Sequence, residues 1–152
     1  MNLPRRRDGL TLIEIIIALA LIVILSAMYF LVANPSGQLA AARNNTRSEN
    51  LESIMLAIRQ SIVDNGSETF SCSSGSLPST STVMESSGGY NIAPCLTPTY
   101  LAVLPVDPSA SSASYVSVSN YNTDYTIMQN PSGSITIAAP NAELKQTISF
   151  TR

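Results

Sequence analysis

The feature that most constrains this chain is a run of 19 residues, from 15 to 33, that contains no charged side chain. The run consists of Ile, Leu, Val, Ala, Met, Tyr and Phe with one serine, Ser26. A helix needs about 20 such residues to cross a hydrocarbon core about 30 Å thick. Because the run is apolar on every face of a helix, and because so short a chain has little core to surround it, the run predicts a membrane-spanning helix rather than a buried helix of a soluble domain.

The flanks of this run predict its orientation and its retention. Arg5, Arg6 and Arg7 lie on its N-terminal side, and basic residues favour the cytoplasmic side of a membrane, so the remainder of the chain would be exported. A secretory signal peptide would have a shorter apolar region of about 7–15 residues, followed by a small-residue cleavage site. No clear Ala-x-Ala site follows the run before residue 34, and we therefore expect the segment to be retained.

The composition argues against an ordinary soluble enzyme. The 152-residue chain is of single-domain length and has no His, which removes the usual general base, the Ser-His-Asp triad and most zinc sites. It carries 8 Lys and Arg against 10 Asp and Glu, so no basic excess points to nucleic acid. We predict no catalytic residues, no cofactor and no direct contact with nucleic acid.

Glu14 is an anomaly at the start of the apolar run. An isolated carboxylate near the beginning of a membrane helix is costly unless it is paired or protonated, which favours a functional role with a partner. The alternative is structural, because a negative charge in the first turn suits the helix dipole and its side chain can reach the membrane interface. The residues around Glu14 favour the functional interpretation.

The segment from Arg5 to Glu14, followed by the apolar run, resembles the signature of type IV prepilins and type II secretion pseudopilins, and reads RRRDGLTLIE. In that family a short basic leader ends in Gly, and a prepilin peptidase cuts after the Gly and methylates the new amino terminus. The resemblance implies cleavage between Gly9 and Leu10, methylation of Leu10, and a role for Glu14 in neutralising another subunit's terminal amine during filament assembly. The family's new terminus is usually Phe, and this chain has Leu instead.

The resemblance also implies the function. The chain would be a structural subunit, a pilin of a type IV pilus-like filament, and the alternative is a pseudopilin of a type II secretion pseudopilus. Its partners would be identical or related pilin subunits, the prepilin peptidase, the inner-membrane assembly platform and, before assembly, the lipid bilayer. It would pass once through the inner membrane with a cytoplasmic N-terminus, and then enter an extracellular filament or a periplasmic pseudopilus. A competence pilin that captures DNA, or a membrane-anchored enzyme or sensor, is less favoured.

Residues 34–37 are expected to interrupt the helix. Pro35 removes a backbone donor, so we predict the helix break at Pro35 and Gly37. In assembled filaments of the family the helix often unwinds partway along, and this segment is the candidate here. Helical periodicity then resumes as an apolar stripe at Leu51, Ile54, Met55, Ile58 and Ile62. Charged residues fall largely off that stripe: Arg43, Arg47, Glu49, Glu52 and Arg59.

The predicted organisation has four parts: a leader at 1–9, a transmembrane or filament-core helix at 10–33, a kink and amphipathic helix at 34–66, and a globular head at 67–152. In the head, Cys72 and Cys95 are two cysteines in an exported, charge-poor segment, and they predict one disulfide. Closing a loop of this length would stabilise the head by about 3 kcal/mol. Residues 67–87 are rich in Ser and Thr and predict a surface loop.

The remainder of the head predicts short antiparallel strands at 115–118, 125–128, 135–137 and 147–151, with a turn at 120–124 and a short helical turn within 98–108. Packed on the long helix, they give an α+β fold. Residues 120–124 alternate in polarity like the opening of a calcium loop, but no Gly or Glu follows at EF-hand spacing. We favour a turn there, and calcium at Asp107 and Asp124 is the weaker alternative.

Overall fold

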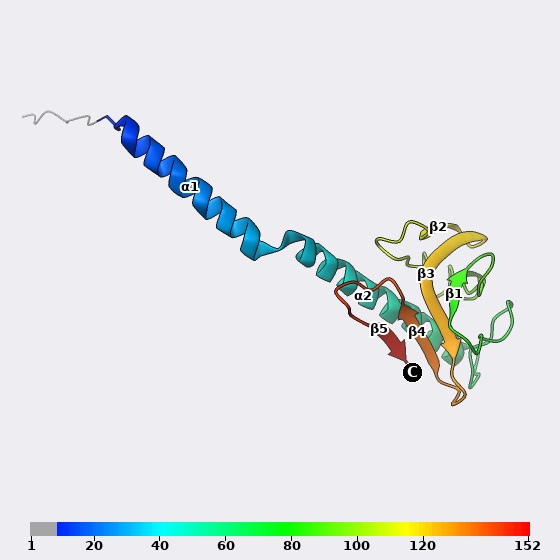
Figure 1. Cartoon of the computed structure of the whole chain (residues 1–152). Coiled ribbons are helices and arrows are strands. Elements are labelled where there is room, and N and C mark those ends of the chain that lie inside the picture. The colour runs from blue at the N-terminus through cyan, green and yellow to red at the C-terminus, as the bar shows by residue number, and fades with distance from the viewer. Residues whose placement is uncertain (1–8) are drawn as a thin grey trace, which may run out of the picture. The chain divides into compact units, whose positions relative to one another are not determined.

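The computed structural model describes residues 9–152, so the predicted leader lies outside the described residues except for Gly9. The chain divides into two compact units between Gln38 and Leu39. The first unit contains helix α1 (Leu12–Ala33), which follows Thr11, and the single residue Asn34 separates α1 from helix α2 (Pro35–Asp64). Figure 1 colours α1 in blue and α2 in cyan to green.

The second unit contains the greater part of α2 and an antiparallel sheet of five strands. The strands are β1 (Thr82–Glu85), β2 (Ser114–Ser117), β3 (Asn120–Gln129), β4 (Ile135–Ala139) and β5 (Ile148–Thr151). Their order is β1-β3-β4-β5, and β2 pairs with the first residues of β3. Figure 1 shows the long, curved β3 at the centre of the sheet, with α2 packed against it. The α+β fold is confirmed.

The core of this unit is formed by one stripe of α2 and one face of the sheet. Leu51, Ile54, Met55 and Ile58 of α2 are buried as the helical spacing predicts, whereas Ile62 is only partly buried. Along β3 and β4 the residues that face the core alternate with more exposed ones, as expected for strands with one face on a helix, and only Thr126 is buried out of this alternation. The alternating buried residues are Tyr121, Thr123, Tyr125, Ile127, Ile135, Ile137 and Ala139.

The predicted turn at 120–124 is wrong, because these residues belong to β3 and the chain reverses between Ser117 and Asn120 instead. The low strand propensity of Asn and Asp is overridden because Tyr121 and Thr123 point into the core. Asp124 adopts a φ of 56° where the pairing with β1 shifts register, so the polar run forms a bulge in a strand rather than a turn.

Two further predictions differ from the structure. Residues 67–87 are not loop throughout, because β1 pairs with β3 and buries Met84. The short helix α3 (Ala93–Leu96) lies just before the predicted helical turn, and residues 101–108 form no helix or strand. With Leu96 and Leu104 both fully buried, tertiary packing and not local propensity determines the path of this segment.

Candidate functional site

The start of α1 is built around Thr11 and Glu14. The Thr11 backbone N–H and hydroxyl each donate to the same Glu14 carboxylate oxygen at 2.8 Å, and the Glu14 N–H donates to the Thr11 hydroxyl at 3.4 Å. This reciprocal capping box satisfies two backbone donors that a helix start otherwise leaves free. In this structure Glu14 therefore has partners within its own chain.

Gly9 and Leu10 precede this cap in exposed backbone. Leu10 is 76% exposed, and among residues 11–152 no atom lies within 4 Å of the position that a Cβ on Gly9 would take. The chain itself thus leaves room for a side chain at position 9. A requirement for glycine there would have to come from a molecule that binds this segment closely.

The side chains of α1 from Leu12 to Phe30 are all exposed, whichever face of the helix they occupy. At 22 residues α1 is about 33 Å long, enough to span a hydrocarbon core. Its most apolar 18-residue window has a mean hydropathy of 3.0. The Ser26 hydroxyl donates to the Ile22 carbonyl at 2.7 Å, so this serine places no unsatisfied donor on the apolar surface.

The interruption between the two helices is a single residue, Asn34, in the left-handed conformation with φ 36°. Its side-chain oxygen accepts from the Ser36 hydroxyl at 3.1 Å and from the Gly37 N–H at 3.4 Å, which caps the start of α2. Pro35 and Gly37 are both helical here, with Pro35 in the first position, where a missing N–H costs nothing. A Cβ on Gly37 would lie 2.7 Å from the side-chain nitrogen of Asn34, so any other residue here would force the capping side chain to shift.

A buried arginine anchors α2 to the head. Arg47 is fully buried, and it donates through Nε and Nη2 to the two carboxylate oxygens of the fully buried Asp107 at 2.7 and 3.1 Å. Its remaining donors reach Asn44 at 2.8 Å, Glu143 at 3.0 Å and the Ser109 hydroxyl at 2.6 Å. A bidentate arginine–carboxylate pair of this kind fixes position and orientation together.

Glu143 extends this arrangement, because it also accepts from Arg43 at 2.6 and 2.7 Å. We refer to Arg43, Arg47, Asp107 and Glu143 as the arginine cluster. Hydrogen bonds from Arg43 and then from Arg47 lower the pKa of Glu143 to about 2. Burial opposes ionisation of Asp107, but hydrogen bonds from Arg47 and the backbone N–H groups of 109 and 110 keep its pKa below the usual value.

The prediction that Arg47 lies off the apolar stripe is wrong, because Arg47 is fully buried. Arg47 lies four residues before Leu51 and three after the buried Asn44, so the stripe continues backwards through polar residues. This helical spacing is the feature of the sequence from which the burial of Arg47 could have been predicted. Its acidic partners lie 60 and 96 positions away in the sequence, where no local pattern identifies them.

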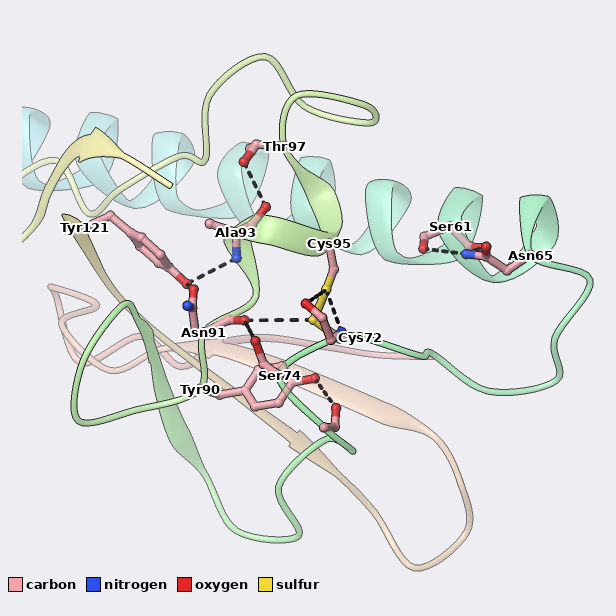
Figure 2. The surroundings of a disulfide bond; sticks show 12 residues. Ser61, Asn65, Cys72, Ser74, Tyr90, Asn91, Ala93, Cys95, Thr97 and Tyr121 are labelled. Carbon is pink, nitrogen blue, oxygen red and sulfur yellow. Dashed lines mark hydrogen bonds between the residues drawn. A yellow bond between two sulfur atoms is a disulfide. The ribbon is translucent and has the colours of Figure 1, made fainter. Parts of the chain in front are cut away.

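The predicted disulfide is present. Cys72 and Cys95 are bonded across a separation of 23 residues, joining the segment after α2 to α3. Figure 2 shows further hydrogen bonds around this bridge: the Ser74 hydroxyl donates to the Asn91 carbonyl at 2.6 Å, and the Tyr90 hydroxyl to the Gly75 carbonyl at 2.9 Å. The bridge and these bonds hold a loop of low apolar content against the core.

The two carboxylates considered for calcium do not come together as a site. Asp107 is paired with Arg47, and Asp124 accepts from the Ser112 hydroxyl at 2.6 Å. Within residues 9–152, no group of three or more Cys, Asp or Glu side chains is placed to hold a metal ion. The carboxylate at position 107 is neutralised by a guanidinium, an arrangement that disfavours a cation there.

Comparison with known proteins supports the interpretation of the N-terminal segment. Residues 4–30 match the family model of the prokaryotic N-terminal methylation motif. Searches of curated proteins and of solved structures found no match. The matched range covers Gly9, Leu10, Glu14 and most of α1. The chain thus carries, at its N-terminal end, the signature of type IV prepilins and pseudopilins.

Proposed function

We propose that this chain is a structural subunit of a type IV pilus-like filament, made as a membrane-inserted precursor and polymerised through α1. The methylation motif and the long apolar helix support a type IV pilin-like or pseudopilin subunit. The observation that carries the proposal is that the two occur together: the motif ends within helix α1, whose side chains from Leu12 to Phe30 are exposed on every face. Proteins with this signature are structural and generally not enzymes.

Processing would hydrolyse the peptide bond between Gly9 and Leu10 on the cytoplasmic side. Water supplies the hydroxyl to the Gly9 carboxylate, and Leu10 gains a free α-amine. The prepilin peptidase would then transfer one methyl group from an electrophilic donor to that amine, with loss of a proton. The exposed backbone at Gly9, which residues 11–152 leave uncovered, supports close approach by an enzyme.

Assembly would exchange lipid around α1 for the α1 helices of other subunits. Within this bundle of α1 helices, the Glu14 carboxylate would pair with the methylated amine of another subunit. Leaving either charge alone in an apolar bundle costs more than pairing the two, so the pair sets the axial register of the subunits. The capping box supports this role, because it holds the carboxylate at the first turn, four residues from the new terminus.

The membrane-spanning length of α1 is consistent with membrane insertion. We propose a single pass through the inner membrane with residues 1–9 in the cytoplasm and the head outside. The partners would be further pilin subunits, the prepilin peptidase and the inner-membrane assembly platform.

Intact mass spectrometry without reducing agent tests this function. We expect filaments sheared from the native host to contain a chain that lacks residues 1–9, carries one methyl group on Leu10 and lacks two hydrogens at the cysteines. Gly9→Glu should leave the precursor uncleaved, whereas the matched control Leu10→Phe, with the family's usual residue, should be cleaved. An uncleaved wild-type chain in its native host would refute the proposal.

The same measurement separates the two filament types. A processed chain that is abundant in the sheared surface fraction indicates a pilus, and a processed chain confined to membranes indicates a secretion pseudopilus. The disulfide in the head favours the pilus, since many pilins carry one there.

A further inference from the structure

The turn between Glu143 and Gln146 holds two residues in an unfavourable conformation. The Gln146 N–H donates to the Glu143 carbonyl at 3.1 Å, and both central residues, Leu144 and Lys145, have a φ of 57°. Turns with two positive φ values favour Asn and Gly, and other residues in this region cost about 1–3 kcal/mol each. Leu144 is nonetheless 52% exposed, so packing in its own chain does not account for a leucine here.

Both ends of this turn are fixed to α2 by one side chain. The Asn44 amide donates to the Glu143 carbonyl at 2.8 Å and to the Gln146 side chain at 2.9 Å, and its oxygen accepts from the Glu143 N–H at 2.9 Å. The Glu143 carboxylate is held in addition by Arg43 and Arg47. Leu144 and Lys145 therefore project from a rigid base, and we call these two residues the tip.

A groove further along α2 has the complementary chemistry. It has a volume of about 540 Å³ and lies between α2 and the segment after α3, with a lining that includes Leu56, Ala57, Gln60, Asp64, Tyr100 and Leu101. Leu56 is 58% exposed, so an apolar surface is open to solvent. Among the lining residues, all of which the structure describes, Asp64 carries the one formal charge. We call this the Asp64 groove.

A second groove of about 360 Å³, on another part of the surface, has the opposite character. Arg59 and Arg152 line it against a single acid, Glu68. A lysine would be repelled there and attracted to the Asp64 groove. This difference in charge therefore favours the Asp64 groove over the second groove as the site at which the tip binds.

We propose that the tip of one subunit docks into the Asp64 groove of a second copy of this chain, with Leu144 on the apolar lining and Lys145 beside Asp64. This inference rests on the proposed function, and adds to it the contact through which neighbouring heads meet. The strained turn is accounted for because it presents a leucine and a cation together to a partner.

The positions of the two surfaces along α2 make the contact self-propagating. Ala57 lies 13 residues after Asn44, which is about 20 Å along the helix axis. Joining the tip of one copy to the groove of the next therefore displaces parallel copies along that axis. A contact between two different patches that does not close on itself extends into a helical array, as a filament requires.

Site-specific crosslinking in assembled material tests the contact. A benzophenone residue replacing Leu144 in the full-length chain is expected to link two copies, with the attachment mapped by peptide mass spectrometry to the segments around Leu56 or Leu101. As a matched position, Val116 is exposed on β2 and belongs to neither surface, and we expect a benzophenone there not to reach the Asp64 groove. Processed filaments in which position 144 links elsewhere or not at all would overturn this inference alone.

Charge exchange provides an independent readout. Asp64→Lys and Lys145→Asp are each expected to lower the amount of sheared filament about threefold, and the double exchange to restore it. Both single variants should fold, because a cation suits the end of α2 and Asp tolerates positive φ. Glu68→Lys makes the same change of charge as Asp64→Lys outside the Asp64 groove and should leave the yield unchanged.

The outcomes separate this inference from the function on which it rests. If the exchange fails to restore filament from a chain that is still cleaved and methylated, the docking contact is wrong and the filament function stands. If the wild-type chain is never cleaved or assembled, the docking contact and the filament function are both refuted.

Discussion

Helices α1 and α2 follow each other in the chain, separated by one residue, but they differ in how their side chains are buried. The side chains of α1 from Leu12 to Phe30 are all exposed, although all but two of these 19 residues are apolar. Helix α2 buries a single stripe against its own sheet, and that stripe includes a fully buried arginine. The comparison teaches that α2 is completed by its own chain, whereas α1 must be completed by lipid or by other helices.

The comparison predicts that changes in the two helices have separable effects. A change in α1 should impair assembly and leave the stability of the head intact. A change at the contacts of α2 should lower the stability of the head. Variants that affect both equally would contradict this division.

The largest effect is expected from Glu14→Gln. Without the carboxylate, the amine of another subunit would be left unpaired among apolar helices, and a buried unpaired charge costs about 3–5 kcal/mol. We expect the amount of sheared filament to fall at least about a hundredfold, with cleavage after Gly9 and the thermal midpoint of the head unchanged. Glu49→Gln, on an exposed face of α2, is the matched control. Normal filaments from the Glu14 variant would exclude the pairing role.

The next effect concerns the head. Asp107→Ala removes the bidentate partner of a fully buried arginine, and we expect it to lower the free energy of unfolding by about 3–5 kcal/mol. Circular dichroism on the full-length chain in detergent micelles would measure this as a lower thermal midpoint. Glu49→Ala should change stability little, since exposed charges contribute little. A head that melts normally without Asp107 would mean that the pair does not anchor α2.

These two predictions differ in how far the sequence alone supports them. The apolar run and the spacing of Gly9 and Glu14 are local patterns, so the long apolar helix α1 and the methylation motif could be predicted from a few neighbouring residues, and cleavage after Gly9 stays a prediction. Arg47 has no such local pattern, because its partners Asp107 and Glu143 reach it only after the head has folded. The burial of a charge is a tertiary property, and hydrophobic periodicity does not encode it.

The strands show the same limit on a smaller scale. The antiparallel sheet and four of its strand positions follow from alternation, but β1 is only four residues long and lies within a Ser-rich and Thr-rich segment. The polar residues of β3 at 120, 122 and 124 predict a turn, yet the alternate positions Tyr121 and Thr123 are buried. Pairing with neighbouring strands determines the secondary structure of such segments, and local composition does not predict it.

A smaller loss of stability is expected when the disulfide is removed. Replacing Cys72 and Cys95 together by serine opens a loop of 23 residues, and the chain-entropy model gives a loss of about 3 kcal/mol. The thermal midpoint of the head should fall, while cleavage at Gly9 and insertion of α1 remain as in the wild type. Adding reductant to the wild-type chain should reproduce the shift, and reductant should have no effect on the double variant. A shift of the double variant with reductant would point to another cause.

The smallest expected effect is a dependence of the thermal midpoint of the head on pH below about 5. Because Arg43 and Arg47 hold the folded pKa of Glu143 near 2, against an ordinary value of 4.5, the unfolded chain binds the proton first as the pH falls. The stabilisation is fully present above about pH 5 and is lost as the pH falls from there towards 2. We expect the thermal midpoint to be level from pH 7 to 5 and to decline below, and Glu143→Gln to flatten the decline. Because Asp107 also has a lowered pKa, part of the decline should persist in that variant. Glu49→Gln should follow the wild type, and an equal decline in both variants would show that the arginine cluster is not what ties the stability of the head to pH.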